Sequence, residues 1–449
     1  SCIKKFPEIV FWNENEAIDH LYFDYNCLIH FCKSNIDELI TDTISQREVD
    51  ELLITEVIRY TVHIITNIVK PNRLVYIAFD GPVPYAKVVK QRNRRYKKIL
   101  DDQYNNKLLK KYGVPKKKSF DSNKITPGTA FMTKLSARLK NIISLGVFSS
   151  HTKQKIQIIL SDCGVVGEGE AKIMKFITNG VGNPRIAVYG LDADLIILSL
   201  LQHTKQIKLL RENEEDVKQF IYFDISKLKS GLIQEYKVVD KDPVRVIKDF
   251  VFFSMLGGND FVDPLVHTKI RENSIDRLFI SYKNCEDYLI NEDNTINMKC
   301  FIDMIQQLCK FEKNYKMSFF SQGGEPTTME EELECYHHKP FANEFHPLHD
   351  SVKPTLSRIR WNTVNWTNDY KTFFFKNENL KDVVKDYLMS MRWCWEYYLN
   401  AEPPSWTYTF SFRNSPLCTD IHEIIKDGNM NINDFVFEKD DPLTPLEQL

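Results

Sequence analysis

The stretch LVYIAFDGP, residues 74–82, decides the fold. Its apolar part, Leu74–Asp80, is short and unbroken, as is typical of a parallel strand buried on both faces, and a Gly-Pro turn follows it. Three more segments have this form, namely Leu21–Asn26, Ile156–Asp162 and Arg185–Gly190. Longer stretches with helical spacing, such as Val49–Lys70 and Ala130–Leu145, lie between them. This alternation predicts an α/β fold, with a mainly parallel central sheet flanked by helices.

The strand pattern ends after Leu265, and the rest of the chain indicates helices. The segments with helical spacing are Ser274–Tyr282, Met298–Phe311 and Leu380–Leu399. Residues 317–350 are polar and predict a long surface loop. From Trp361 onward the chain is rich in aromatic residues, which we interpret mainly as a packed helical layer. We therefore expect two regions, an α/β region over 1–275 and a mostly helical region over 276–449.

The composition excludes several classes of protein. The chain has 449 residues, of which 43% are hydrophobic and 27% charged, so it is neither disordered nor fibrous. Lys plus Arg (59) nearly balances Asp plus Glu (61), so the net charge says nothing about partners. No uninterrupted apolar run approaches the roughly 18 residues of a membrane span, and we expect no membrane association. The chain starts without Met, and we expect both ends to be truncated.

The ten cysteines include no C-x-x-C pair and do not indicate a disulfide framework. We therefore expect a reducing compartment, the cytoplasm, with the nucleus as the alternative. Cys335, His337 and His338 are close in sequence, but without a second ligand pair a surface loop is the favoured interpretation over a metal site.

Carboxylates follow every predicted strand, and one more follows the apolar segment DFVFFSMLGGND, where Gly257 and Gly258 end a helix. The seven acids are Asp24, Asp80, Glu168, Glu170, Asp192, Asp194 and Asp260. Ligands of open α/β sheets bind beyond the carboxyl ends of the strands, so these acids should converge. Their repulsion would be relieved by divalent cations, and carboxylate oxygens suit Mg²⁺ or Mn²⁺. Two ions about 4 Å apart can clamp a phosphodiester during hydrolysis.

Each acid also has a purely structural interpretation. An Asp after a strand is often a helix cap or turn residue, and for Asp24 or Asp80 alone we favour that by about two to one. The doublets Glu168/Glu170 and Asp192/Asp194 are harder to explain as caps, so the joint pattern favours a metal site. Asp162 also ends a strand but has no doublet, and we assign it to a turn.

A basic segment follows Asp80. Between Lys87 and Lys118 there are 13 Lys or Arg residues and two acids. Lys87, Gln91, Arg94 and Arg95 share one helical face and combine point charge, neutral donor and bidentate forks, which suits a phosphate pocket. For an arbitrary helix a solvated basic face is about three times as common, but the direct link to Asp80 reverses that preference. Lys107 to Lys118 indicate a general surface for a polyanion.

Seven blocks of sequence resemble, in order, the signature blocks of the Xrn/Rat family of 5′→3′ exoribonucleases, within the wider flap-endonuclease-like and PIN-like nucleases. They read LYFDYNCLIH, AFDGPVPYAKVVKQRNRRY, FDSNKITPGTAFM, GVVGEGEAKIM, YGLDADLIIL, GGNDF and IRENSIDRL. The resemblance is densest over residues 20–285 and resumes at WCWEYY, PPSW and PLTPLEQL. Two family features are missing, an opening Met-Gly-Val-Pro stretch and a His-Tyr-Ala-Pro-like run, for which this chain has TYTFSFRNSP.

The resemblance implies roles for individual residues. The seven acids match the family's metal-binding and catalytic acids, and Lys87, Gln91, Arg94 and Arg95 match its pocket for a 5′-monophosphate. His30 matches a histidine that stacks on the first RNA base, and Trp406 in PPSW is the candidate for the tryptophan beside it. On its own, His30 would more often be a satisfied core histidine.

The sequence therefore favours a metal-dependent 5′→3′ exoribonuclease. With two Mg²⁺ or Mn²⁺ ions it would degrade single-stranded RNA bearing a 5′ monophosphate to mononucleotides. A flap-type 5′ DNA nuclease would share the acids, but the KVVKQRNRRY and ITPGT blocks favour RNA. An inactive RNA-binding scaffold would be expected to have lost at least one acid, and all are present.

Overall fold

The computed structural model describes residues 6–12, 17–41, 43–116, 118–150, 156–190, 192–213, 215–217, 219–235, 242–268, 275–315, 329, 359–376, 378–412 and 414–448. Apart from Met329, the predicted loop over 317–350 lies outside the described residues, and so do Cys335, His337 and His338.

Within the described residues the sheet has seven strands in the order β1-β7-β6-β5-β2-β3-β4. They are β1 (Val10–Phe11), β2 (His20–Asp24), β3 (Leu74–Ala78), β4 (Gln157–Ser161), β5 (Arg185–Tyr189), β6 (Gln206–Glu212) and β7 (Phe220–Asp224). The five strands from β6 to β4 are parallel, while β7 and β1 pair antiparallel at one edge. The predicted α/β class and mainly parallel sheet are therefore confirmed. The four predicted strands are β2 to β5, whereas β1, β6 and β7 were not anticipated.

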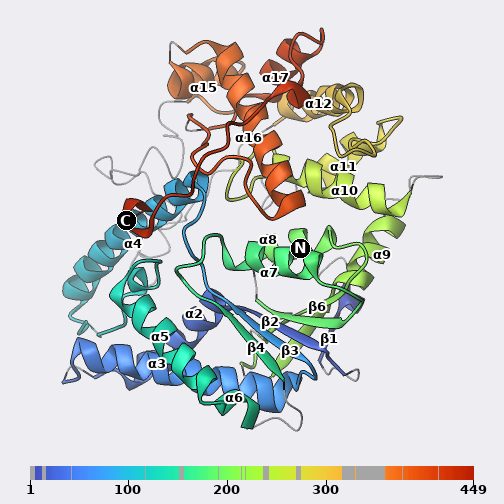
Figure 1. Ribbon diagram of the computed structural model, residues 1–449. Helices are drawn as coiled ribbons and strands as arrows, with labels where there is room; N and C mark the ends of the chain where they lie inside the picture. Colours follow the sequence, from blue (N-terminus) through green and yellow to red (C-terminus); the bar gives the residue numbers. More distant parts are fainter. Residues whose placement is uncertain are drawn as a thin grey trace.

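Helices cover both faces of the sheet (Figure 1). Those of one face are α2 (Tyr25–Ile36), α3 (Gln46–His63, continued by a π-helical turn, Ile64–Val69) and α5 (Ala130–Ser144), with α6 (Val147–Ser150) nearby. The other face carries α7 (Gly169–Asn179), α8 (Ala193–Leu200) and α9 (Ile225–Glu235). Alternate residues of β2 separate accordingly, because Leu21 and Phe23 join the hydrophobic cluster of α2, α3 and α5, while Tyr22 joins that of α7 and α8.

The segment Gln46–Val69 is long and apolar enough to cross a membrane by length and composition alone. In the fold it is a core helix. Ser45 and Glu48 form a capping box at its start, and Val49, Leu53 and Val57 are fully buried against the sheet. Burial in the core explains its apolar character, and the absence of membrane association stays a prediction.

The second region forms a helical layer beyond α7 and α8 (Figure 1). It contains α10 (Pro243–Ser254), α11 (Ile275–Lys283), α12 (Met298–Lys313), α15 (Trp366–Phe375), α16 (Leu380–Asn400) and α17 (Cys418–Ile425). Trp393 and Trp395 of α16 are buried in the cluster that also contains sheet residues such as Val188. This confirms the packed aromatic layer. The division near residue 275 stays a prediction, and the hydrophobic cluster contains residues from both sides of it.

The basic segment forms α4 (Tyr85–Tyr112), a helix of 28 residues that extends away from the sheet (Figure 1). The short helix α18 (Pro445–Gln448) lies against it, since the Glu447 and Gln448 carbonyls accept hydrogen bonds from Arg92 and Arg95.

Candidate active site

Three parallel strands end together and present carboxylates at one edge of the sheet. In the strand register Asp24 is opposite Ala78, and Phe23 is opposite Tyr189. Asp80 therefore comes two residues beyond the end of β3, and Asp192 follows closely on β5. The carboxyl ends of these strands are the edge where the sequence placed the acids.

The Glu168/Glu170 doublet is brought to the same edge by a glycine at the start of α7. A Cβ atom on Gly169 would lie 3.2 Å from Asp24 Oδ1 and 3.4 Å from Asp80 Oδ1, so a larger residue would crowd both carboxylates. The Gly169 amide also donates to Asp80 Oδ1 at 2.8 Å. Glycine at this position thus lets the helix start approach the strand ends closely.

The carboxylates repel one another in a poorly solvated space. Burial, and then the charge of Asp80, raise the pKa of Asp24 to about 7. Burial also raises the pKa of Asp194 to about 7, with Asp192 adding to the rise and Lys87 opposing it. The pKa of Glu170 lies well above its usual value because of burial and the charge of Glu168. The structure therefore brings the predicted acids into one electrostatic cluster. Asp192 is its exposed member and, contrary to expectation for the doublet, also caps α8, with its Oδ1 accepting from the Asp194 amide at 3.3 Å.

A lysine ammonium lies inside this acidic cluster. Lys87 is 6% exposed, and its Nζ pairs with Glu168 Oε1, with Asp260 Oδ2 at 2.7 Å and, more distantly, with Glu170 Oε1 at 3.9 Å. Although burial opposes it, the charges of Glu168, Glu170 and Asp260 raise the pKa of Lys87 well above its usual value. Lys87 thus compensates part of the acidic charge, and its role as a phosphate ligand beside Gln91, Arg94 and Arg95 stays a prediction.

The other predicted phosphate ligands lie further out on α4. Arg94 is 61% exposed and its Nη2 lies 3.1 Å from Asp260 Oδ2. Gln91 is half-buried, and Arg95 Nη2 donates to the Gln448 carbonyl at 3.3 Å. Burial opposes ionisation of Asp260, but the charges of Lys87 and Arg94 lower its pKa. Asp260 is therefore the physical link between the acidic cluster and the exposed cations of α4.

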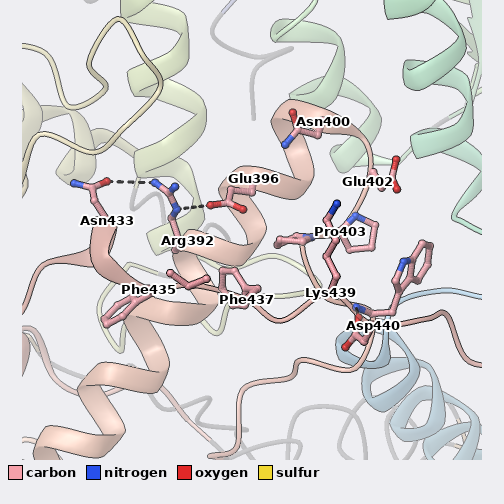
Figure 2. Close-up of a pocket in the computed structure, with 13 residues that line it drawn as sticks. Arg392, Glu396, Asn400, Glu402, Pro403, Asn433, Phe435, Phe437, Lys439 and Asp440 are labelled. Carbon is pink, nitrogen blue, oxygen red and sulfur yellow. Dashed lines mark hydrogen bonds and ion pairs between the residues drawn. The ribbon is translucent and has the colours of Figure 1, made fainter.

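The two predicted stacking residues lie on different elements. His30 is exposed on α2, where partial burial of its ring lowers its pKa and the charge of nearby Asp80 opposes that change. The Trp406 carbonyl accepts from the Tyr85 amide at 2.8 Å, at the start of α4. Trp406 also lines a cavity of about 690 Å³, together with Pro403, Lys439 and other residues seen in Figure 2. Stacking of either side chain on a base stays a prediction.

Two tyrosines of α16 reach the acids from the helical layer, and the sequence analysis had assigned them only to packing. Tyr397 donates to Glu168 Oε2 at 2.8 Å, and Tyr398 donates to Asp194 Oδ1 at 3.1 Å. The Asn259 side-chain amide donates in turn to the Tyr398 hydroxyl at 3.0 Å. Their sequence signal was the position of WCWEYY in a block that resembles the family.

A third missed group is Asn26, which follows Asp24 by two residues. Its Nδ2 donates to Asp80 Oδ2 at 2.7 Å, and its Oδ1 accepts from the Asp80 amide at 3.3 Å. Asn26 thereby fixes the orientation of the Asp80 carboxylate. By contrast, Asp162 has the predicted turn role, because its Oδ1 accepts from the Gly164 amide at 3.0 Å and its other oxygen pairs with Lys140.

The donor set fits Mg²⁺ or Mn²⁺. The groups that converge are carboxylate oxygens, which hard divalent cations prefer. Burial makes their mutual repulsion costly, and a bound cation would remove it. The residues that would hold the ions are Asp24, Asp80, Glu168, Glu170, Asp192, Asp194 and Asp260.

Comparison with known families accounts for almost all of the chain. Residues 2–213 match the family described as "XRN 5'-3' exonuclease N-terminus", and residues 240–334 and 348–449 match "Xrn1 helical domain". The chain belongs to the Xrn family. The human 5'-3' exoribonuclease 1 is 28% identical over 98% of this chain and 29% of its own length. The Saccharomyces cerevisiae 5'-3' exoribonuclease 1 is 33% identical over 66% of this chain and 21% of its own length.

These relatives are much longer than this Xrn-family chain. The 5'-3' exoribonuclease 2 of Kluyveromyces lactis, for example, is 33% identical over 66% of this chain but only 35% of its own length. Among solved structures, the catalytic core of Rad2 in complex with a DNA substrate aligns with a TM-score of 0.37 and 13% identity. That alignment covers 83% of this chain and 92% of the Rad2 chain, but the similarity is too low to bear on function.

Proposed function

We propose that this Xrn-family chain is a metal-dependent 5′→3′ exoribonuclease acting on single-stranded RNA with a 5′ monophosphate. The observation that carries the proposal is that the acidic cluster lies next to the start of the basic helix α4. Lys87 and Arg94 of α4 both form ion pairs with Asp260 of the cluster. A nuclease that measures from a 5′ end needs these two features side by side, one for hydrolysis and one for the terminal phosphate.

Different residues of the chain would serve cleavage and substrate binding. Mg²⁺ held by the acids would activate water and offset the charge that develops on the scissile phosphate. Asn26, Tyr397 and Tyr398 orient the Asp80, Glu168 and Asp194 carboxylates through their hydrogen bonds. The exposed guanidinium of Arg94 offers a directional, charge-assisted donor to the terminal phosphate. His30 and Trp406 would stack on bases, which is tolerant of sequence.

The two rival functions differ from this one in what they require. A flap-type DNA nuclease would use the same acids but would not need a free 5′ monophosphate on RNA. An inactive scaffold would bind RNA without hydrolysing it, and would not need the full set of seven acids that the chain carries. The presence of all seven acids therefore favours catalysis over binding alone.

The deciding experiment compares substrates of one sequence with Mg²⁺. The RNAs carry a 5′ monophosphate, triphosphate, hydroxyl or cap, and a 5′-monophosphate DNA and a circular RNA serve as controls. We expect mononucleotide release to be fastest for the monophosphate RNA and absent for the circle. Faster cleavage of the DNA would support the flap-type nuclease, and RNA binding without cleavage in Mg²⁺ or Mn²⁺ would support the scaffold.

A further inference from the structure

A second group of ligand-type side chains lies in the helical layer, separate from the seven acids. His267, Glu312 and Cys418 are all buried, and one ligand atom from each lies within 4.8 Å of the other two. They come from three different segments, the loop that follows Gly258, the end of α12 and the first residue of α17. An imidazole and a carboxylate in a dry core need polar partners, because each is costly to bury without one.

Glu312 accepts three hydrogen bonds from the start of α17, which oppose the rise in its pKa that burial causes. Its Oε1 accepts from the Cys418 amide at 2.7 Å, and its Oε2 accepts from the Thr419 amide and hydroxyl at 3.0 and 2.9 Å. A carboxylate has about four acceptor positions, so one position on Oε1 is unused. His267 Nδ1 lies 3.9 Å from that same oxygen. The separation is too long for a hydrogen bond.

His267 is the unexplained member of the group. It is 0% exposed, and neither ring nitrogen makes a hydrogen bond of normal geometry, although the Leu308 backbone lies close to the ring. Burial, followed by the charge of Arg277, lowers the pKa of His267 to about 4, against a smaller opposing effect of the Leu308 backbone. A buried imidazole nitrogen that makes no hydrogen bond can offer its lone pair to a metal ion. Asp420, two residues after Cys418, also has a buried oxygen without a partner, Oδ2.

We propose that His267, Glu312 and Cys418 bind one structural Zn²⁺ ion. Zinc takes this mixture of nitrogen, oxygen and sulfur ligands, at about 2.0–2.3 Å from each. Tetrahedral zinc holds such ligand atoms about 3.3–3.6 Å apart, so the 3.9 Å between Nδ1 and Oε1 would shorten by a few tenths of an ångström on binding. A thiolate and a carboxylate also balance the two positive charges, so the site is neutral overall. A water would complete the coordination.

The ion would join the helical layer to the loop that carries Asp260. His267 follows Asp260 by seven residues, and the Arg277 side chain donates to the His267 carbonyl at 2.8 Å. Glu312 and Cys418 anchor the ion to α12 and α17. Loss of zinc should therefore loosen the contacts among these three segments, without removing any group that faces the seven acids.

The test uses the full chain with Co²⁺ as a spectroscopic substitute for Zn²⁺. Only a cysteine ligand gives a sulfur-to-cobalt charge-transfer band, whereas the acidic cluster offers oxygen ligands. We expect one zinc per chain in metal analysis of the purified protein, and a sulfur-to-cobalt band after exchange. The band should disappear in Cys418→Ser and weaken or shift in His267→Gln.

Two matched controls locate the sulfur. Cys27 donates to Asp24 at 2.9 Å beside the acidic cluster, and Cys300 is buried on α12 like Glu312. The band should persist in Cys27→Ser and in Cys300→Ser. A wild-type chain with no zinc and no sulfur-to-cobalt band would overturn the proposal, and so would a band that is lost in Cys27→Ser but kept in Cys418→Ser. The zinc content and the sulfur-to-cobalt band of the wild-type protein test the proposal by themselves, even if a variant folds poorly.

Discussion

The acidic cluster is negatively charged and largely buried, whereas the part of α4 that carries Arg94 is positively charged and exposed to solvent. Glu168 and Glu170 are 3% and 7% exposed, and burial raises the pKa of each. Arg94, which touches the same Asp260 as Lys87 does, is 61% exposed. Charges in low dielectric interact strongly and are costly to leave unpaired, whereas exposed charges are screened by water. The buried region should therefore control both hydrolysis and stability, and the exposed region should control only how a substrate end is held.

The largest effect is expected from Asp194, a partly buried member of the acidic cluster. Asp194→Asn keeps the size of the side chain and can keep the Tyr398 hydrogen bond, but it removes a charge that would bind the metal. We expect hydrolysis of 5′-monophosphate RNA to fall by about 1000-fold or more, with unchanged circular dichroism. Asp162→Asn is the matched control, because Asp162 ends a strand but serves a turn, and it should retain near-normal activity. Equal rates for the two variants would contradict the assignment.

Replacing Lys87 tests whether the fold needs a buried cation among the acids. Lys87→Met leaves Glu168 and Asp260 without their buried partner, and removal of one member of such a pair costs about 3–5 kcal/mol. We expect the free energy of unfolding in EDTA to fall by roughly 3 kcal/mol, with partial recovery on addition of Mg²⁺. The control Lys90→Met breaks a half-exposed pair with Asp263 and should cost less than about 1 kcal/mol. Similar losses in both variants would show that burial does not distinguish the two lysines.

How much of this could be predicted from sequence depended on whether the signal was local. The four predicted strands are short apolar runs, and the acids were predicted because they follow those runs, although β7 (Phe220–Asp224) is a similar run that was overlooked. β6 was missed because it carries Lys208, Arg211 and Glu212 in a charged pattern, although Glu212 is buried and accepts hydrogen bonds from Tyr60 and Tyr189. Its strand character depends on tertiary partners that lie far away in sequence.

The contacts between regions could not be predicted for the same reason. Nothing near Tyr397 indicates that its hydroxyl meets Glu168, which is 229 residues away. The helical spacing of Lys87, Gln91 and Arg94 suggested one common face. It could not show that Lys87, at the base of α4, is enclosed by acids from α7 and the Asp260 loop while Arg94 stays exposed. Packing between distant segments decides such environments.

A smaller effect is expected from a substitution of an exposed cation on α4. Arg94→Ala removes a charge-assisted donor worth roughly 1.5–3 kcal/mol, or about 10- to 100-fold in rate. The loss should appear on 5′-monophosphate RNA and be much smaller on 5′-hydroxyl RNA. Lys98→Ala is the control on the same helix, since Lys98 pairs with Asp102, one turn further along. If Arg94→Ala slowed both substrates by the same factor, the arginine would belong to a general basic surface instead.

The smallest effect is the pH dependence of the metal-free protein. Asp24 and Asp194 have folded-state pKa values of about 7, raised by burial and neighbouring acids from an ordinary value near 3.8. A carboxyl whose pKa is raised on folding binds its proton more tightly in the folded state. Its contribution to stability is therefore complete below the unfolded pKa and is lost as the pH rises through about 7. In EDTA, the free energy of unfolding should fall by about 2–3 kcal/mol between pH 6 and pH 8, roughly half from each carboxyl, which is a few degrees in Tm.

Mg²⁺ should reduce or reverse that fall, because it binds the deprotonated carboxylates and so stabilises the folded state more at pH 8 than at pH 6. Other titrating groups also contribute to the pH dependence, so the informative quantity is the difference between the wild type and Asp194→Asn, in which one of the two shifted carboxyls is absent. We expect the fall in EDTA to be about half as large in Asp194→Asn. If the two proteins instead lost the same stability between pH 6 and pH 8, the raised pKa of Asp194 would be wrong, and the acids would be better solvated than their burial indicates.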